Sequence, residues 1–205
     1  MNTSLTIVGI GGSMAPASTS LAALKIALEG AGEAEARTEL INIASLNLPM
    51  FVPRTQDVPA SATKLAAAVY DAAGLIWSSP LYHGTISGSF KNALDWLELL
   101  SSREPPYLTN KVVGLISTAG GVQGLQAVNT MEFVVRALRG WTVPLVIPIP
   151  RAMQAFDADG QPREPQIAQQ LRSLGQEVVR AAKQFSVSGY SDYDAGHGAV
   201  EPQPK

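Results

Sequence analysis

The sequence contains no cysteine, and this absence excludes disulfide bonds, thiolate metal sites and a cysteine nucleophile. Charged residues are also scarce, at 16% of the chain, and the formal net charge at pH 7 is only −2. A charge so close to zero gives no electrostatic reason to expect a nucleic-acid partner. No apolar run reaches the ~20 residues of a membrane span, and no basic segment precedes the first apolar run. We therefore expect a cytoplasmic protein with no membrane partner and no signal peptide.

Apolar residues are abundant instead, at 46% of 205 residues, which is enough for one sizeable core. Short runs rich in Val and Ile alternate with longer segments of helical periodicity. The expected strands are residues 5–10, 38–43, 75–78, 112–117 and 143–149. The expected helices are roughly residues 19–31, 61–72, 88–101, 125–139 and 165–185. This strict alternation predicts a doubly wound α/β fold, in which helices cover both faces of a buried parallel sheet.

Local signals define the boundaries of this domain. Ser61 is expected to cap the second helix, and Gly140 to end the fourth helix after a basic last turn. Residues 186–205 are rich in Gly, Ser, Asp and Pro and have no periodic apolar face. We therefore expect a single domain over residues 1–185 and a flexible tail over residues 186–205.

The loop after the first strand, residues 9–20, is rich in glycine and hydroxyl groups. In open parallel sheets, ligands bind outside the carboxyl ends of the strands, so this position is informative. Ser13, Ser18, Thr19 and Ser20 can donate to phosphate oxygens, beside the positive end of the following helix. The same loop also fits a plain turn in which Ser18 only caps the helix. The glycine spacing matches neither a P-loop nor G-x-G-x-x-G, and this favours a mononucleotide phosphate.

The most specific stretch follows the third strand. It contains Pro80, Tyr82, Gly88, Lys91, Asn92, Asp95 and Trp96. Through these residues the chain resembles the NADPH-dependent FMN reductase family of flavodoxin-like proteins, whose pattern runs approximately P-x-Y-x-x-x-x-x-G-x-x-K-N-x-x-D-W. The first loop is similar to the family's G-S-x-R-x-x-S-x-N/S phosphate loop through Gly12, Ser13, Ser18 and Ser20. The resemblance covers roughly residues 5–185.

The resemblance implies a flavodoxin-like three-layer sandwich, with a five-stranded parallel sheet of order 2-1-3-4-5 and helices on both faces. It implies FMN as cofactor and NADPH as hydride donor. A small-molecule acceptor (a flavin, a quinone, an azo compound or a metal oxyanion) would take the electrons. Because a flavin ring itself carries out hydride chemistry, we expect no catalytic side chain and no metal.

Polar, glycine-bearing loops after the first, third and fourth strands are expected to meet at one crevice. Taken alone, residues 117–124 form a flexible turn and His83 is an exposed loop histidine; the resemblance assigns both loops to the flavin ring. The expected cofactor-binding residues are Ser13, Ser18, Thr19, Ser20, Pro80, Leu81, Tyr82, His83, Gly84, Thr85, Thr118, Gly120, Gly121 and Gln123.

Ala15 departs from the family pattern, which commonly has arginine at this position. A phosphate dianion would lose a charge-assisted partner there. We therefore expect FMN to be held by hydroxyls and amides, and to exchange readily.

Trp96 and Leu99 fall away from the apolar stripe of their helix and form a second apolar patch. Such a patch usually marks an interface. The resemblance implies a homodimer or homotetramer built through this helix.

Two other functions are compatible with parts of the sequence. An FMN-binding electron carrier or flavin-sensing module would lack NADPH turnover, but carriers are usually strongly acidic and this chain is near neutral. A hydrolase is disfavoured because Ser13 and Ser117 do not lie in G-x-S-x-G. Only two histidines exist, and His197 falls in the expected tail.

Overall fold

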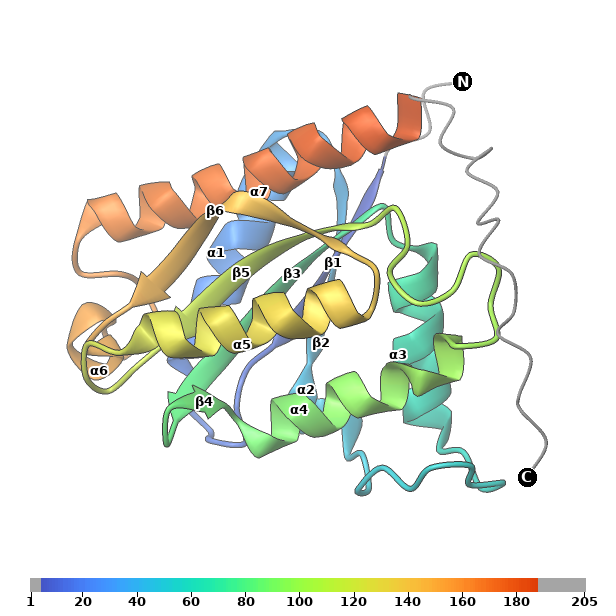
Figure 1. The fold of residues 1–205 in the computed structure, drawn as a ribbon. Helices are drawn as coiled ribbons and strands as arrows, with labels where there is room; N and C mark the ends of the chain where they lie inside the picture. Colours follow the sequence, from blue (N-terminus) through green and yellow to red (C-terminus); the bar gives the residue numbers. More distant parts are fainter. Residues whose placement is uncertain (1–4, 188–205) are drawn as a thin grey trace.

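The computed structural model describes residues 5–187, which form a parallel sheet between two layers of helices (Figure 1). Five strands lie in the order β2-β1-β3-β5-β6. They are β1 (Thr6–Gly11), β2 (Arg37–Asn42), β3 (Gly74–Tyr82), β5 (Val112–Thr118) and β6 (Trp141–Ile149). The short β4 (Thr85–Ile86) pairs antiparallel with the end of β3. The expected strand order of the parallel sheet is confirmed.

The helices divide between the two faces of the sheet (Figure 1). One face is covered by α1 (Thr19–Glu33) and α7 (Pro165–Val187), which pack against each other. The other face is covered by α3 (Ala60–Asp71), α4 (Gly88–Asp95), the 3₁₀ helix η1 (Trp96–Leu100) and α5 (Gly124–Ala137). Two short helices, α2 (Ile43–Leu46) and α6 (Ala152–Ala155), lie in connections.

Successive strand residues supply two separate cores because their side chains alternate between the faces. Ile76 packs with α1 and α7, whereas its neighbour Trp77 packs under α4 and meets Phe90 edge-on at 5.9 Å. The inner strands therefore need apolar residues at every position. The edge strand β2 does not, and residues 37–40 are exposed. The expected buried run, residues 38–43, is therefore buried only at Ile41 and Ile43, and its first part is exposed at the edge of the sheet.

Two predicted helix boundaries also needed correction. Helix α3 begins at Ala60, so Ser61 lies within its first turn and makes no cap; Pro59 precedes the helix without a side-chain cap. Helix α5 ends at Ala137, and the left-handed residue after it is Arg139, with φ of 65°, rather than Gly140. Gly140 still contributes to this end because its N–H donates to the carbonyl of Val135 at 2.9 Å.

Trp96 does not form an exposed patch, contrary to the expectation from helical periodicity. Its side chain is only 2% exposed, because the segment around Pro49 and Phe51 covers it. The indole Nε1 donates to the carbonyl of Pro49 at 3.0 Å, and the ring meets Phe51 edge-on at 5.2 Å. Asn92 holds the same segment: Nδ2 donates to the carbonyl of Pro49 (2.9 Å), and Oδ1 accepts from the N–H of Phe51 (2.8 Å). Periodicity identified a residue off the main stripe, but not the distant segment that packs on it.

The last helix extends to Val187, two residues into the predicted tail. Residues 188–205 lie outside the described part of the chain, and so does His197. Among residues 5–187, no helix combines the length and apolar character needed to cross a membrane.

Candidate cofactor site

The first loop folds tightly against the end of β3. Gly12 has φ of 101°, a conformation that favours glycine, and its N–H donates to the carbonyl of Ser78 at 3.2 Å. In return, Ser78 Oγ donates to the carbonyl of Ser20 at 2.8 Å. These two bonds hold the loop and the start of α1 at the carboxyl edge of the sheet.

The hydroxyl groups of this loop have different roles. Ser18 is the N-cap of α1, since its Oγ accepts from the N–H of Leu21 at 3.2 Å and lies 3.0 Å from Ser20 Oγ. Ser13 Oγ accepts from the N–H of Ala15 at 3.3 Å. The N–H groups of Thr19 and Ser20, in the first turn, have no acceptor among the described residues. The loop can therefore cap its helix and still present donors to an anion.

The segment after β3, expected as a polar, glycine-bearing loop, is a hairpin. β3 continues to Tyr82, turns at His83 and Gly84, and returns as β4. Both turn residues have positive φ, of 49° and 84°, which is the conformation of a two-residue hairpin turn. The glycine at the second turn position was the signal that could have predicted it; β4 is too short to show periodicity.

Polar bonds fix the base of this hairpin. Ser79 Oγ accepts from the N–H of Ser87 at 3.1 Å and donates to the carbonyl of Pro80 at 3.0 Å. Ser87 in turn caps α4 through the N–H of Phe90. Pro80 is buried and Leu81 half-buried, whereas residues 82–85 are exposed. The hairpin therefore presents a polar tip on a rigid base.

The third loop follows β5, which ends at Thr118. Ser117 Oγ donates to the carbonyl of Gly124 at 2.6 Å and so anchors the start of α5. The carbonyl of Gly121 accepts from the N–H of Arg151 at 2.9 Å. Gly120, Gly121 and Gln123 are exposed, and a Cβ built on Gly120 would meet nothing within 4 Å. This loop borders open space that a ligand can occupy.

All three loops start from one edge of the sheet (Figure 1). Gly11 pairs with Ser78, and Pro80 pairs with Thr118. The hairpin tip also reaches α5, since Thr85 Oγ1 lies 3.2 Å from Thr130 Oγ1. The structure thus brings the three predicted loops, with every predicted cofactor-binding residue, to the same edge.

Each loop exposes one large apolar side chain. Met14, Tyr82 and Val122 are 62%, 51% and 66% exposed. Sequence reasoning named only Tyr82, because exposure of the other two depends on the final fold. Exposed apolar groups beside free N–H donors fit a ligand with a flat ring and a phosphate, and these are the parts of FMN.

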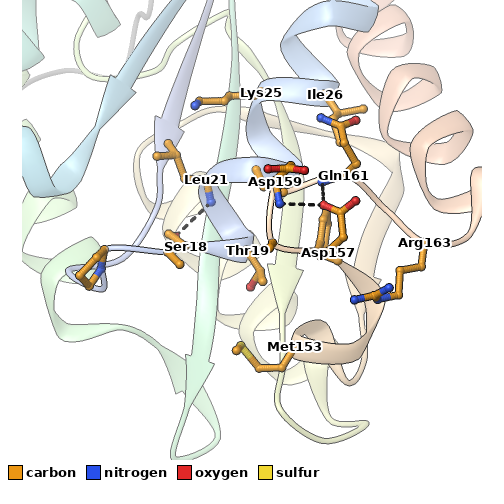
Figure 2. Close-up of a pocket in the computed structure, with 16 residues that line it drawn as sticks. Ser18, Thr19, Leu21, Lys25, Ile26, Met153, Asp157, Asp159, Gln161 and Arg163 are labelled. Carbon is orange, nitrogen blue, oxygen red and sulfur yellow. Dashed lines mark hydrogen bonds between the residues drawn. The ribbon is translucent and has the colours of Figure 1, made fainter.

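A cavity of about 560 Å³ adjoins the first loop (Figure 2). The start of α1 lines one side, and residues 153–163 line the other. It includes Ser18 and Thr19 but no residue of the second or third loop. The sequence did not predict this cavity, because the apolar residues of segment 153–163 follow neither the strand nor the helix period and so gave no expected position for the segment.

Comparison with known proteins adds independent evidence. The sequence model of a family described as NADPH-dependent FMN reductase matches residues 5–154. The NADPH-dependent FMN reductase ArsH of Acidithiobacillus ferrooxidans is 30% identical over 148 residues, 71% of this chain and 61% of that protein. The FMN-dependent NADPH-azoreductase of Staphylococcus aureus is 37% identical over 86 residues, 42% of this chain and 43% of that protein.

A solved structure shares the fold. FerB, a flavoenzyme NAD(P)H:(acceptor) oxidoreductase from Paracoccus denitrificans, superposes with a TM-score of 0.72 at 19% identity. The superposition covers 88% of this chain and 98% of FerB. The matched region spans 61% or less of the length of the ArsH proteins. Since the family match extends over residues 5–154, this chain belongs to the NADPH-dependent FMN reductase family.

Proposed function

We propose that the protein is an NAD(P)H-dependent flavin oxidoreductase that binds FMN at the three-loop edge and passes electrons to a second small molecule. The observation that carries this proposal is the convergence of three donor-bearing loops, each with one exposed apolar side chain. When bound, FMN supplies the hydride chemistry, and NADPH supplies the hydride. The residues of the chain then need only to bind and orient the flavin and to shield it from water.

The proposed roles follow from position. The N–H groups of Thr19 and Ser20, with the hydroxyls of the first loop, hold the phosphate at the positive end of α1. Residues 80–85 and 118–123 present backbone groups to the ring edge. Gly120, where an added Cβ would meet nothing within 4 Å, leaves room for the ring and for a planar molecule stacked on it.

The acceptor is proposed as a small planar or oxidised molecule. Two similar proteins are named an FMN reductase and an azoreductase, which supports a free flavin or an azo compound as candidates. A quinone or a metal oxyanion fits the same chemistry. The alternative, an electron carrier or flavin sensor, binds FMN at the same edge but does not oxidise NADPH.

We also propose a homodimer or homotetramer in the cytoplasm. Trp96 is not its contact, because it is buried within the chain. The exposed surface beside α4 is instead a groove of about 610 Å³ between α4 and α5. Phe133 lies in its wall and is 67% exposed, which supports the groove as an interface.

Flavin binding is tested by titrating apoprotein with FMN and following quenching of flavin fluorescence. Saturation at or below roughly tens of micromolar FMN is expected. Gly120→Val should weaken binding about tenfold or more, because its side chain enters open space beside the third loop without touching the protein. The matched control is Gly32→Val, which also enters open space but lies near the far end of α1. Equal affinity in both variants would place FMN elsewhere.

A further inference from the structure

The cavity beside the first loop lies between the start of α1 and residues 153–163 (Figure 2). We propose that it receives the adenosine half of the nicotinamide dinucleotide that reduces the flavin, and that Arg163 pairs with a phosphate of that half. The inference rests on the proposed function, which puts FMN at the three-loop edge. It adds a separate subsite for the hydride donor.

FMN is too short to use this cavity, because it ends at the phosphate that the first loop is proposed to hold. The cavity lies beyond that loop and shares Ser18 and Thr19 with it. The nicotinamide ring of the donor has to reach the flavin ring for hydride transfer. A dinucleotide carries two phosphates and an adenosine beyond its nicotinamide riboside, so it is longer than FMN. Its far end therefore needs a place beyond the FMN phosphate, and the cavity is such a place.

The third loop is joined to the cavity by α6. The N–H of Ala152 donates to the carbonyl of Ala119, and the N–H of Arg151 donates to the carbonyl of Gly121, both at 2.9 Å. The next residue, Met153, is largely exposed and lines the cavity. The edge of the cavity is thus fixed to a loop that is proposed to flank the flavin ring. A molecule stacked on the ring can extend across this edge into the cavity.

The wall opposite α1 is a preformed hairpin. Asp157 Oδ1 accepts from the N–H groups of Asp159 (3.0 Å) and Gln161 (2.8 Å). Gly160, with φ of 77°, lies so close to α1 that an added Cβ would be 3.2 Å from Ala22 Cβ. The hairpin is thus docked on the helix. The volume of about 560 Å³ lies in the usual range for small-ligand sites.

Arg163 supplies a cation that no other described residue uses. Its side chain makes no hydrogen bond or ion pair with residues 5–187. Figure 2 shows its guanidinium turned toward the side of Thr19 and Met153. Asp159 lies on the other side of Asp157 in the same view. A phosphate can therefore pair with the guanidinium, while ribose hydroxyls donate to a carboxylate.

The apolar part of the wall suits the base. Ile26 and Phe156 are buried on the protein side, while Met153 is exposed at the edge of the cavity. An adenine ring can cover Met153 and remove its surface from water. Phosphate, ribose and base therefore each have a matching group in one cavity.

Calorimetry tests this subsite. FMN-loaded protein is titrated with NADP⁺ and with NAD⁺, which lacks the 2′-phosphate, and each apoprotein is titrated with FMN. The variants are Arg163→Gln, which removes the cation, and Ala158→Trp, which places a bulky side chain on the exposed wall of the cavity. The matched control is Arg151→Gln, an exposed arginine beside α6 but outside this cavity.

We expect both variants to bind NADP⁺ about tenfold more weakly and FMN within about twofold of wild type, and the control to change neither. In Arg163→Gln the affinity for NAD⁺ should fall less, because the 2′-phosphate is a monoester with a second ionisation and each 5′-phosphate is not. An equal fall for both dinucleotides would also support the subsite, with Arg163 paired to a 5′-phosphate.

Unchanged affinities for NADP⁺ and NAD⁺ in both variants, with FMN still bound, would overturn the inference. Wild-type protein that fails to bind FMN would contradict the proposed function instead.

Discussion

Lys111 lies at the amino end of β5, far in the sheet from the loops at its carboxyl edge, and is partly buried. Its Nζ donates to the carbonyls of Tyr70 (2.6 Å) and Ala72 (2.8 Å) at the end of α3 and lies 5.6 Å from the centre of the Tyr70 ring. Arg103 lies over the same ring. Burial lowers the pKa of Lys111 from 10.5 to about 8, and the nearby Asp71 opposes this shift.

This pKa predicts how stability changes with pH. Between pH 8 and 10.5 the unfolded chain binds more protons at this lysine than the folded chain, so the free energy of unfolding should rise with pH. The rise is on the order of 3 kcal/mol, and below pH 8 the full cost of the buried charge is present. Urea unfolding from about pH 7 to about pH 10 measures it. Lys111→Met should remove the rise; parallel profiles for both proteins would assign it to other groups.

Ala15 is the second residue whose identity sets a measurable property. Ala15→Arg should tighten FMN by about 1.5–3 kcal/mol, roughly ten- to a hundredfold, through a charge-assisted bond to the phosphate. Riboflavin has no phosphate, so its affinity should stay nearly constant. Fluorescence titration with both ligands separates the phosphate contribution from ring stacking. Equal tightening of both ligands, or of neither, would show that the first loop does not hold the phosphate.

At the scale of elements, the K-N-x-x-D-W motif of α4 and η1 forms two kinds of contact. Lys91 and Asp95 form an exposed i,i+4 ion pair, whereas Asn92 and Trp96 hold the segment around Pro49 through side-chain bonds. The ion pair was predictable from spacing alone. The contacts of Asn92 and Trp96 with the segment around Pro49 were not predictable, because that segment lies more than 40 residues earlier in the sequence.

The hydrogen bonds of Asn92 to this segment give a stability prediction, for which the neighbouring Lys91 is the control. Asn92→Ala should lower the free energy of unfolding by about 2 kcal/mol, because two hydrogen bonds to the backbone of Pro49 and Phe51 are lost. The adjacent Lys91→Ala removes only a solvent-exposed pair and should cost less than about 0.5 kcal/mol. Urea unfolding of both variants checks the difference. Similar losses would mean that the segment around Pro49 is held by other contacts.

The elements also show the reach and the limit of sequence reasoning. All five main strands and all five main helices were predictable, because burial on a sheet imposes periodicity on long segments. The turn at His83 and Gly84 was missed because it depends on backbone φ rather than on hydrophobic pattern. The hairpin at residues 156–162 was missed for a similar reason: bonds to Asp157 build it, with a single bridge.

On the scale of the whole molecule, the place of the candidate site followed from topology. Loops after β1, β3 and β5 meet because parallel neighbouring strands end at the same edge. The cavity beside α1 could not be predicted from the topology, because it forms only when residues 153–163 fold back on a helix about 130 residues earlier in the sequence.

Assembly is the prediction that belongs to this scale. Light scattering should show a homodimer or homotetramer at assay concentrations. Phe133→Glu should dissociate it, because a carboxylate would replace the exposed apolar ring that the interface is proposed to cover. Met153→Glu, at an exposed methionine outside the groove, is the control and should leave the mass unchanged. A monomeric wild-type protein would contradict the prediction, and an unchanged mass for Phe133→Glu would place the interface elsewhere.

Oxidation of NADPH by a bound flavin is the activity proposed for this protein. The most direct measurement is an anaerobic titration of FMN-loaded protein with NADPH, followed by the visible absorption of the flavin. We predict that the absorption bleaches as about one equivalent of NADPH is added. It should return when an acceptor such as an azo dye or a quinone is supplied. Protein that binds FMN but keeps its visible absorption in the presence of excess NADPH and NADH would contradict the account and identify a carrier or sensor.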